Sequence, residues 1–512
     1  MKKLMVFIFF WVQFAFAVAP DVGTPEQQEL GKKTYSFRCS QCHGDAGDGK
    51  GVAYKRTKPW PRDFTKGVYK FKTTPDDRLP TTADIMNTIK HGNPHTVMPG
   101  WPMLTEQEVK NVAYYLKTFT SDFSDPDTLE DEAVAPIPLK DIPTSAPAWS
   151  QDSADKGKAL FKENKCMDCH GLAGRGAGKS ASEQSDMDGN QVRPRDLSKR
   201  WTFRNGHSRP EIFRTISTGL APMPSFHNLS VEQRWNIVDY VYSLGDRDEP
   251  KYGTVVASQL MKKDLDITLG EKLFEQAPRV YLPVMGQVTQ PGRAFYASAN
   301  GVEVKSVYNQ DEIAFLVVWH DMKAEITQSN APDMEVPLFN DDSEKEKAGQ
   351  YSDAIAIQIP SQQVKGAKKP YFIFGDKNMA VDLWFADLAH AKEAAQLYIA
   401  KGFKNIKKGD EEIQFKASYD EGRWVAIFKR KLKKEKGTSF APAEFTPIAF
   451  SIWDGFNNER GNKRALTSWF HVYLQPEKNE SALAMKVAMA GFLFILFEVT
   501  FVFFVRKKYS EI

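Results

Sequence analysis

The sequence has only four cysteines in 512 residues and lacks an excess of either charge. Lys and Arg number 68 and Asp and Glu number 65, a balance that excludes a basic nucleic-acid-binding chain and an acidic disordered tail. All four cysteines lie in two short motifs, which leaves none for a disulfide elsewhere. The hydrophobic content of 42% excludes a wholly disordered chain, and the length suggests roughly three or four domains.

The N-terminus has the features of a secretory signal. Lys2 and Lys3 precede an apolar run from Leu4 to Ala17 that closes with Ala-Phe-Ala. This run predicts a signal peptide over residues 1–17, cleaved once the chain has crossed the inner membrane. An uncleaved anchor is the alternative, but about 14 apolar residues are short for a bilayer that needs about 20.

The C-terminus predicts a single membrane-spanning helix over residues 485–505. From Val487 to Val505 the only charge is Glu498, and these residues, at about 1.5 Å each, span roughly 28 Å of hydrocarbon. Arg506 and the two lysines after it stay in the cytoplasm by the positive-inside rule. We therefore expect a single-pass protein of the cytoplasmic membrane, with its bulk in the periplasm and its C-terminus in the cytoplasm.

The cysteines form two C-x-x-C-H motifs, Cys39-Ser-Gln-Cys42-His43 and Cys166-Met-Asp-Cys169-His170. Thiols three positions apart on a helical turn form thioethers to two haem vinyl groups, and the adjacent histidine then reaches the iron as proximal ligand. A thioredoxin-like redox pair and a zinc site are alternatives, but the histidine is in place twice and export suits covalent haem attachment. We expect two covalent haems c.

A repeat of about 95 residues surrounds the two motifs. In each copy a helix precedes the motif, and an amphipathic helix follows a Met-Pro dipeptide. Met98 comes 55 residues after His43, and Met223 comes 53 residues after His170. Because the spacing nearly agrees in both copies, the two methionines are the favoured second ligands of the irons.

Both copies resemble class I cytochromes c, over residues 22–123 and 148–246. The resemblance implies two all-α cytochrome c domains, with iron ligated by His43 and Met98 in the first and by His170 and Met223 in the second. Histidines near the methionines stay open as alternative ligands: His91, His95, His207 and His227. Irons with protein ligands on both faces have no open site, so these haems are expected to transfer electrons rather than bind substrate.

An arginine recurs between motif and methionine in both copies. Arg62 lies in a Pro-Arg-Asp-Phe segment and Arg195 in a Pro-Arg-Asp-Leu segment. A guanidinium at this place could pair with a haem propionate or lie solvated at the surface. Both arginines are therefore candidate cofactor contacts.

The chain changes character after the second copy. Residues 124–147, which join the copies, are rich in Pro, Asp and Glu and predict an extended or mobile linker. From about residue 253 to 476, alternating apolar residues predict strands, and we expect a β-rich sandwich domain. This region contains no cysteine, which excludes iron-sulfur clusters and covalent haem from it.

Several short segments of this third region resemble, in the family's order, the haem-b (γ) subunit of the ethylbenzene-dehydrogenase type. These segments lie at 317–321, 352–360, 370–376, 381–384, 424 with 430–432, and 449–455. Such subunits accompany molybdenum enzymes of the dimethyl-sulfoxide-reductase class. The resemblance implies one non-covalent haem b in addition to the two haems c.

In that family a methionine and a lysine hold the haem b. The resemblance assigns the lysine to Lys463, in the loop after Trp-Asp-Gly. Phe374 stands where the family has its methionine, so Met379 nearby is the candidate substitute. Three further residues are open as ligands: Met322, His320 and His471.

The features together predict an electron-transfer subunit with no catalytic activity of its own. It would relay electrons between the molybdenum and iron-sulfur subunits of a nitrite oxidoreductase or nitrate reductase-like enzyme and soluble or membrane carriers of the respiratory chain. A di-haem peroxidase-like catalyst is one alternative, which the matched methionines disfavour. A di-haem subunit of a cbb-type oxidase is another, which the single C-terminal helix and the β-rich region disfavour.

Overall fold

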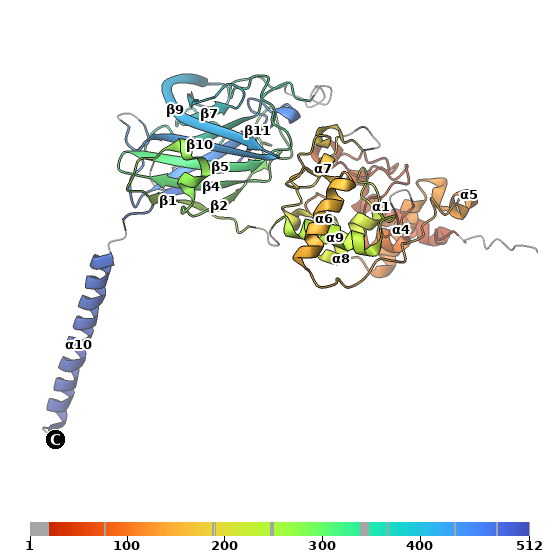
Figure 1. Cartoon of the computed structure of the whole chain (residues 1–512), viewed down its shortest axis with the longest axis horizontal. Coiled ribbons are helices and arrows are strands. Elements are labelled where there is room, and N and C mark those ends of the chain that lie inside the picture. The colour runs from red at the N-terminus through yellow and green to blue at the C-terminus, as the bar shows by residue number, and fades with distance from the viewer. Residues whose placement is uncertain are drawn as a thin grey trace, which may run out of the picture.

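The chain folds into a helical N-terminal region, a β-rich region and one long C-terminal helix (Figure 1). The computed structural model describes residues 20–510, except 76–77, 187–188, 190, 246–249, 338–347, 365, 367, 435–436 and 478–479. The predicted signal peptide at 1–17 lies outside the described residues. In Figure 1 the second helical unit lies between the β-rich region and the first helical unit.

The helical region consists of two units with the same order of elements. The first unit contains α1 (Pro25–Arg38), α2 (Ser40–His43), η1 (Tyr54–Arg56), α3 (Thr82–His91), α4 (Glu106–Lys117) and η2 (Ser121–Phe123). The second contains α6 (Gln151–Glu163), α7 (Cys166–His170), η3 (Ala181–Glu183), η4 (Arg200–Thr202), α8 (Arg209–Thr218) and α9 (Val231–Ser243). The repeat seen in the sequence is therefore a repeat of structure.

Capping boxes begin the last helix of each unit. The Thr105 side chain accepts from the Glu108 N–H, and the Glu108 carboxylate accepts from the Thr105 N–H. Ser230 and Gln233 form the same pair at the start of α9. Each box satisfies backbone groups that a helix start leaves without partners, which explains why both helices begin where the sequence predicts.

A glycine permits the first and last helices of each unit to cross closely. A Cβ on Gly31 of α1 would lie 2.0 Å from the Asn111 carbonyl oxygen of α4. A Cβ on Gly157 of α6 would lie 1.8 Å from the Asn236 carbonyl oxygen of α9. Any side chain at these positions forces the helices apart.

Gly31→Ala and Gly157→Ala are expected to destabilise their units by about 1 to 3 kcal/mol or more, because backbone atoms cannot move aside as a side chain can. Urea unfolding of the full chain, followed by helical circular dichroism, measures the change. Lys32→Ala, at an exposed neighbour on α1, is the matched control and should change little. Unchanged stability in both glycine variants would contradict the observed helix crossing.

The expectation of an extended linker at 124–147 was wrong, because this segment packs against the first unit. It contains α5 (Pro126–Glu130), in which Leu129 is buried. The Leu79 N–H donates to the Val134 carbonyl at 2.7 Å. Further along, the Asp141 carboxylate pairs with the buried Arg234 of the second unit. A few apolar residues among the Pro, Asp and Glu residues suffice to fasten the segment to both units.

The β-rich region is a 13-stranded sheet that closes on itself, because β13 pairs with both β1 and β11. The order is β13-β1-β4-β5-β10-β9-β8-β7-β6-β11-β12-β3, and β2 pairs with β4. The strands are β1 (Val255–Leu260), β2 (Val280–Pro283), β3 (Met285–Gly286), β4 (Gly301–Tyr308), β5 (Glu312–His320), β6 (Ala354–Pro360), β7 (Val381–Asp387), β8 (Ala394–Ala400), β9 (Ile406–Asp420), β10 (Arg423–Lys431), β11 (Phe445–Trp453), β12 (Ala465–Leu466) and β13 (Phe470–Leu474).

The predicted apolar segments of this region are strands. The segments 302–307, 313–319, 354–359 and 424–428 lie in β4, β5, β6 and β10. Alternate side chains of these strands form the main core, in which Phe315, Trp384 and Phe428 are almost completely buried. Two short helices, η5 (Ile267–Phe274) and η6 (Gly455–Asn457), lie in its loops.

Helix α10 (Glu480–Ser510) extends away from the β-rich region (Figure 1). Its segment Ala488–Arg506 has a mean hydropathy of 2.4 and is wholly exposed in the chain alone. By length and composition this segment fits a single membrane span, close to the predicted 485–505.

Candidate functional site

The first C-x-x-C-H motif opens onto a cavity of about 360 Å³. Cys39, Cys42 and His43 line it from α2 and the residue before it, and Met98 lines it from the loop after α3. Most of the remaining wall is apolar or aromatic, with Phe64, Tyr69, Ile85, Ile89, Trp101, Val112 and Leu116. The structure thus brings the four predicted ligand and attachment residues of the first unit together at one cavity that suits a large apolar cofactor.

The two motif histidines have the same orientation. His43 Nδ1–H donates to the Arg62 carbonyl oxygen at 3.0 Å, and His170 Nδ1–H donates to the Arg195 carbonyl oxygen at 3.0 Å. Burial lowers the pKa of both imidazoles, which favours the neutral ring. With Nδ1 engaged in this way, Nε2 is free to bind a metal.

The four motif cysteines are half-buried and form no disulfide. Burial raises the pKa of the Cys39 and Cys166 thiols to about 11.

In the first unit the methionine is better placed than the histidines. His91 bonds to the Asn87 carbonyl on the exposed side of α3, and His95 bonds to the Trp201 carbonyl of the second unit. Neither lines the cavity, whereas Met98 does.

The second unit repeats the arrangement around Cys166 and His170. Met223 packs against the same hydrophobic cluster as Cys166, together with Phe213 and Trp235. Of the alternatives, His207 is exposed, and His227 is bonded to the Ser225 hydroxyl at 2.6 Å. Met223 is accordingly the described residue that best matches Met98.

The recurring arginines contribute through their backbones as well as their side chains. The carbonyls of Arg62 and Arg195 orient the histidines, a role that the sequence analysis missed. The signal for it was the same Pro-Arg-Asp segment that recurs in both copies. Arg62 also lines the cavity, and Arg195 is half-buried, so both remain candidate propionate partners.

Both helical units match one family of known proteins. Residues 26–116 and 152–241 match the model described as cytochrome C oxidase, cbb3-type, subunit III. The two helical units, about a third of the chain, are therefore cytochrome c domains, and this domain family implies haem binding.

Individual relatives resemble part of this cytochrome. A protein of Haloferax mediterranei (strain ATCC 33500) named as a respiratory nitrate reductase haem subunit is 24% identical over 207 residues, 40% of this chain and 66% of that protein. The cbb3-type cytochrome c oxidase subunit CcoP of Helicobacter pylori (strain 52) is 23% identical over 231 residues, 44% of this chain and 61% of that protein. The cytochrome thus spans less than two thirds of the length of each of these relatives.

One similar solved structure is a chain of the Kuenenia stuttgartiensis reducing HAO-like protein complex Kustc0457/Kustc0458. It is 36% identical, covers 45% of the cytochrome and 100% of its own chain, and has a TM-score of 0.39.

The loop after the second haem motif docks on the β-rich region of the cytochrome. The Ala173 N–H donates to the Glu421 carboxylate at 2.8 Å, and the Arg175 guanidinium pairs with Asp420 at 3.1 Å. His320 Nε2–H donates to the Arg175 carbonyl at 2.6 Å. The β-rich region therefore contacts the haem-motif loop of the second unit directly.

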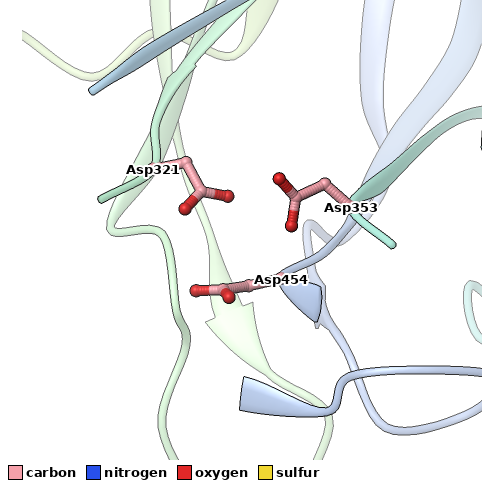
Figure 2. Close-up of side chains that lie close together, drawn as sticks. All are labelled: Asp321, Asp353 and Asp454. Carbon is pink, nitrogen blue, oxygen red and sulfur yellow. The ribbon is translucent and has the colours of Figure 1, made fainter. Parts of the chain in front are cut away.

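Three buried carboxylates lie at the same end of the β-rich region (Figure 2). Asp321 follows β5, Asp353 precedes β6 and Asp454 follows β11, and their ligand oxygens lie within 4.8 Å of one another. Arg193 of the second helical unit pairs with Asp454 at 2.9 Å. Carboxylate oxygens are also the ligands that a hard divalent cation prefers.

The negative charge of the three carboxylates is partly balanced by bound protons and by the Arg193 guanidinium. Burial and the neighbouring carboxylates raise the pKa of Asp321 and Asp353 well above the usual value. Burial and Asp454 raise the pKa of Glu459, beside the cluster, to about 8. At neutral pH the cluster accordingly holds protons that exposed carboxylates would have lost.

Asp321→Asn is expected to stabilise the protein at pH 8 by on the order of 1 kcal/mol, or roughly 2 to 4 °C in unfolding midpoint. A raised native pKa gives stability that is present at low pH and lost as pH rises, so the gain should vanish near pH 4. The amide can keep the bond that Asp321 accepts from the Lys323 N–H. Thermal unfolding at both pH values, with the exposed Asp264→Asn as control, measures the effect. Destabilisation at pH 8 would instead show that the negative charge is needed, as for a bound divalent cation.

The residues around the expected haem b methionine do not fit an iron ligand. Phe374 is completely buried, and the Arg464 guanidinium carbon lies 3.6 Å from its ring centroid. Met379 is half-buried in the following turn, where its N–H donates to the Asp376 carboxylate at 3.1 Å. Packed apolar and cationic groups thus fill the place that the resemblance assigns to the ligand.

The other haem b candidates have different contacts. Lys463 lies in the loop between β11 and β12, near the buried Glu459. The remaining candidates lie in separate contacts: His320 at the Arg175 carbonyl, His471 with Lys369, and Met322 beside Ala181 and Phe456. Haem b stays a prediction.

Proposed function

We propose that this cytochrome is a membrane-anchored subunit that relays electrons by means of two covalently held haems c. The observation that supports the proposal is the duplicated site, in which a C-x-x-C-H motif, a histidine oriented through Nδ1 and a methionine recur. The exposed apolar segment of α10 supports the membrane anchor. The basic residues after it favour a cytoplasmic C-terminus and a periplasmic bulk.

Each residue of a site has a distinct task. The two thiols would hold a haem through thioethers, and the histidine Nε2 and the methionine sulfur would be its iron ligands. When bound, the haem supplies one-electron oxidation and reduction. With two protein ligands the iron would have no position for a substrate, and we infer that the cytochrome has no catalytic activity by itself.

We propose a molybdenum and iron-sulfur oxidoreductase as the partner, of the nitrite oxidoreductase or nitrate reductase type. Two observations support it: the ordered segments of the β-rich region that resemble the γ subunit, and the similarity to a protein named as a nitrate reductase haem subunit. Respiratory-chain carriers, soluble or in the membrane, would exchange electrons with the other end of the relay.

A second candidate function is that of a di-haem subunit in a cbb-type oxidase. The match of both helical units to the cbb3-type family model and the similarity to CcoP favour it. The sheet of 13 strands lies outside both segments that match this family, which favours the first candidate.

Purification of the tagged, membrane-extracted complex distinguishes the two candidates. We expect molybdenum and non-haem iron to co-elute with the cytochrome, and added nitrite or nitrate to change its haem reduction level. An untagged membrane preparation is the control for carry-over. Copper and a polytopic haem protein in place of molybdenum would support the oxidase subunit and overturn the first proposal.

A further inference from the structure

Arg204 belongs to the second helical unit but lines the cavity of the first. The other residues that line this cavity all come from residues 35–116 of the first unit. The cavity therefore has a wall made by both units, and that wall carries a positive charge.

The backbone next to Arg204 is held by the second unit. Phe203 packs against the hydrophobic cluster around Phe213 and Trp235. Arg200, in η4, donates to the Gly245 carbonyl at 2.7 Å, and its guanidinium carbon lies 3.8 Å from the Tyr242 ring centroid. The Arg204 side chain thus starts from a fixed point and reaches across the boundary.

The first unit is fastened to the same short segment. His95 Nε2–H donates to the Trp201 carbonyl at 2.6 Å, and His95 lies three residues before Met98. The loop that carries the predicted iron ligand is therefore anchored to the segment that carries Arg204. These contacts hold the Met98 loop at a set position relative to the backbone of Arg204.

The guanidinium of Arg204 is incompletely paired. Its Nε is buried and has no hydrogen-bond partner among the described residues. Burial, and then the neighbouring Arg195, lowers the pKa of Arg204 to about 10. Arg204 as a whole is half-buried, and a partly buried cation beside a second cation is costly unless an anion lies close to it.

A haem carries two such anions, its propionates, on one edge. Arginine pairs with carboxylates through parallel N–H bonds, which suits this contact. The charge of such an arginine also stabilises the reduced iron, because the oxidised iron carries one more positive charge.

We propose that Arg204 completes the haem site of the first unit from the second unit, by pairing with a haem propionate and raising the potential of that haem. The inference rests on the proposed function, because it requires a haem c in each unit. In this role Arg204 contacts the cofactor directly, and it makes the potential of one haem depend on the docking of the other unit.

The test is Arg204→Gln in the full-length holoprotein, in a Met223→His background. The histidine lowers the potential of the second haem, so that the two haems titrate separately. We expect Arg204→Gln to shift the potential of the first haem downward and to leave that of the second nearly unchanged. Arg204→Lys should restore part of the shift, because it keeps the charge but loses the parallel N–H bonds.

Arg279→Gln is the matched control, since it removes the same charge from an exposed site in the β-rich region and should shift neither potential. An unchanged potential of the first haem in Arg204→Gln, with two haems still bound, overturns the inference and leaves the proposed function intact. A shift of the second haem alone overturns it as well. Fewer than two covalent haems in the parent protein would contradict the proposed function itself.

Discussion

Replacement of Cys166 and Cys169 by alanine is expected to halve the covalent haem content of the protein. Each C-x-x-C-H motif can hold one haem through two thioethers, and the described residues offer no other thiols. Haem staining of a denaturing gel and intact mass, both of which report only covalent haem, measure the loss. The parent protein should show two haem increments and the variant one.

Cys39→Ala with Cys42→Ala is the matched variant in the first unit and should also leave one haem. Ser40→Ala, between the first two thiols, is the control and should retain both. Acidified acetone removes non-covalent haem only, so the same samples report whether any haem b is present. Two increments in either double cysteine variant would contradict covalent attachment at that motif.

Met98→His is expected to lower the potential of one haem by roughly 0.1 V or more, a part of the about 0.8 V that axial ligands span. Replacement of the thioether by imidazole removes the ligand that favours reduced iron. The near-infrared band that arises from sulfur bound to ferric iron should fall to about half. Redox titration and absorption spectroscopy measure the two effects, and Met223→His should have the equivalent effect on the second haem.

Met86→Leu is the control for this prediction, because Met86 also packs in the first unit but does not line the cavity. It should leave the band and both potentials unchanged. A full band in both Met98→His and Met223→His would show that these methionines only fill the core, and His91 or His227 would then be tested next.

The features that could be predicted from the sequence are those that depend on residues close together in the chain. The number of residues from His43 to Met98 nearly equals the number from His170 to Met223. In both copies the helix before the methionine loop, α3 or α8, ends at a glycine with positive φ, Gly92 or Gly219. These turns set the path to the methionine loop. Capping boxes likewise depend on residues three positions apart, so the start of α4 and α9 could be predicted.

Contacts between distant segments could not be predicted in the same way. Arg193 and Arg204 lie in irregular segments, where no periodicity indicates which way a side chain points. Their partners, at Asp454 and at the cavity of the other unit, become neighbours only after the units dock. The packing of residues 124–147 was missed for the same reason, since composition reports polarity but not the few apolar anchors.

The haem b ligands could be proposed only from resemblance, and at one of these positions the side chain differs from that of the family. The order of segments in the β-rich region resembles that of the γ subunits, and this resemblance stays a prediction, but the fully buried Phe374 under Arg464 stands where those subunits have a methionine. A fold can retain its strands while the side chains of a site are replaced by ordinary core packing.

The attachment of residues 124–147 to both helical units has a consequence for the speed of electron transfer. A loose tether would let the units approach and separate, and each transfer would wait for an encounter. Here Leu79 and Val134 join the segment to the first unit, and Asp141 joins it to Arg234 of the second. In the proposed two-haem relay, these contacts would hold the two sites at a set separation, and the rate of transfer would depend on that separation and on the difference in potential.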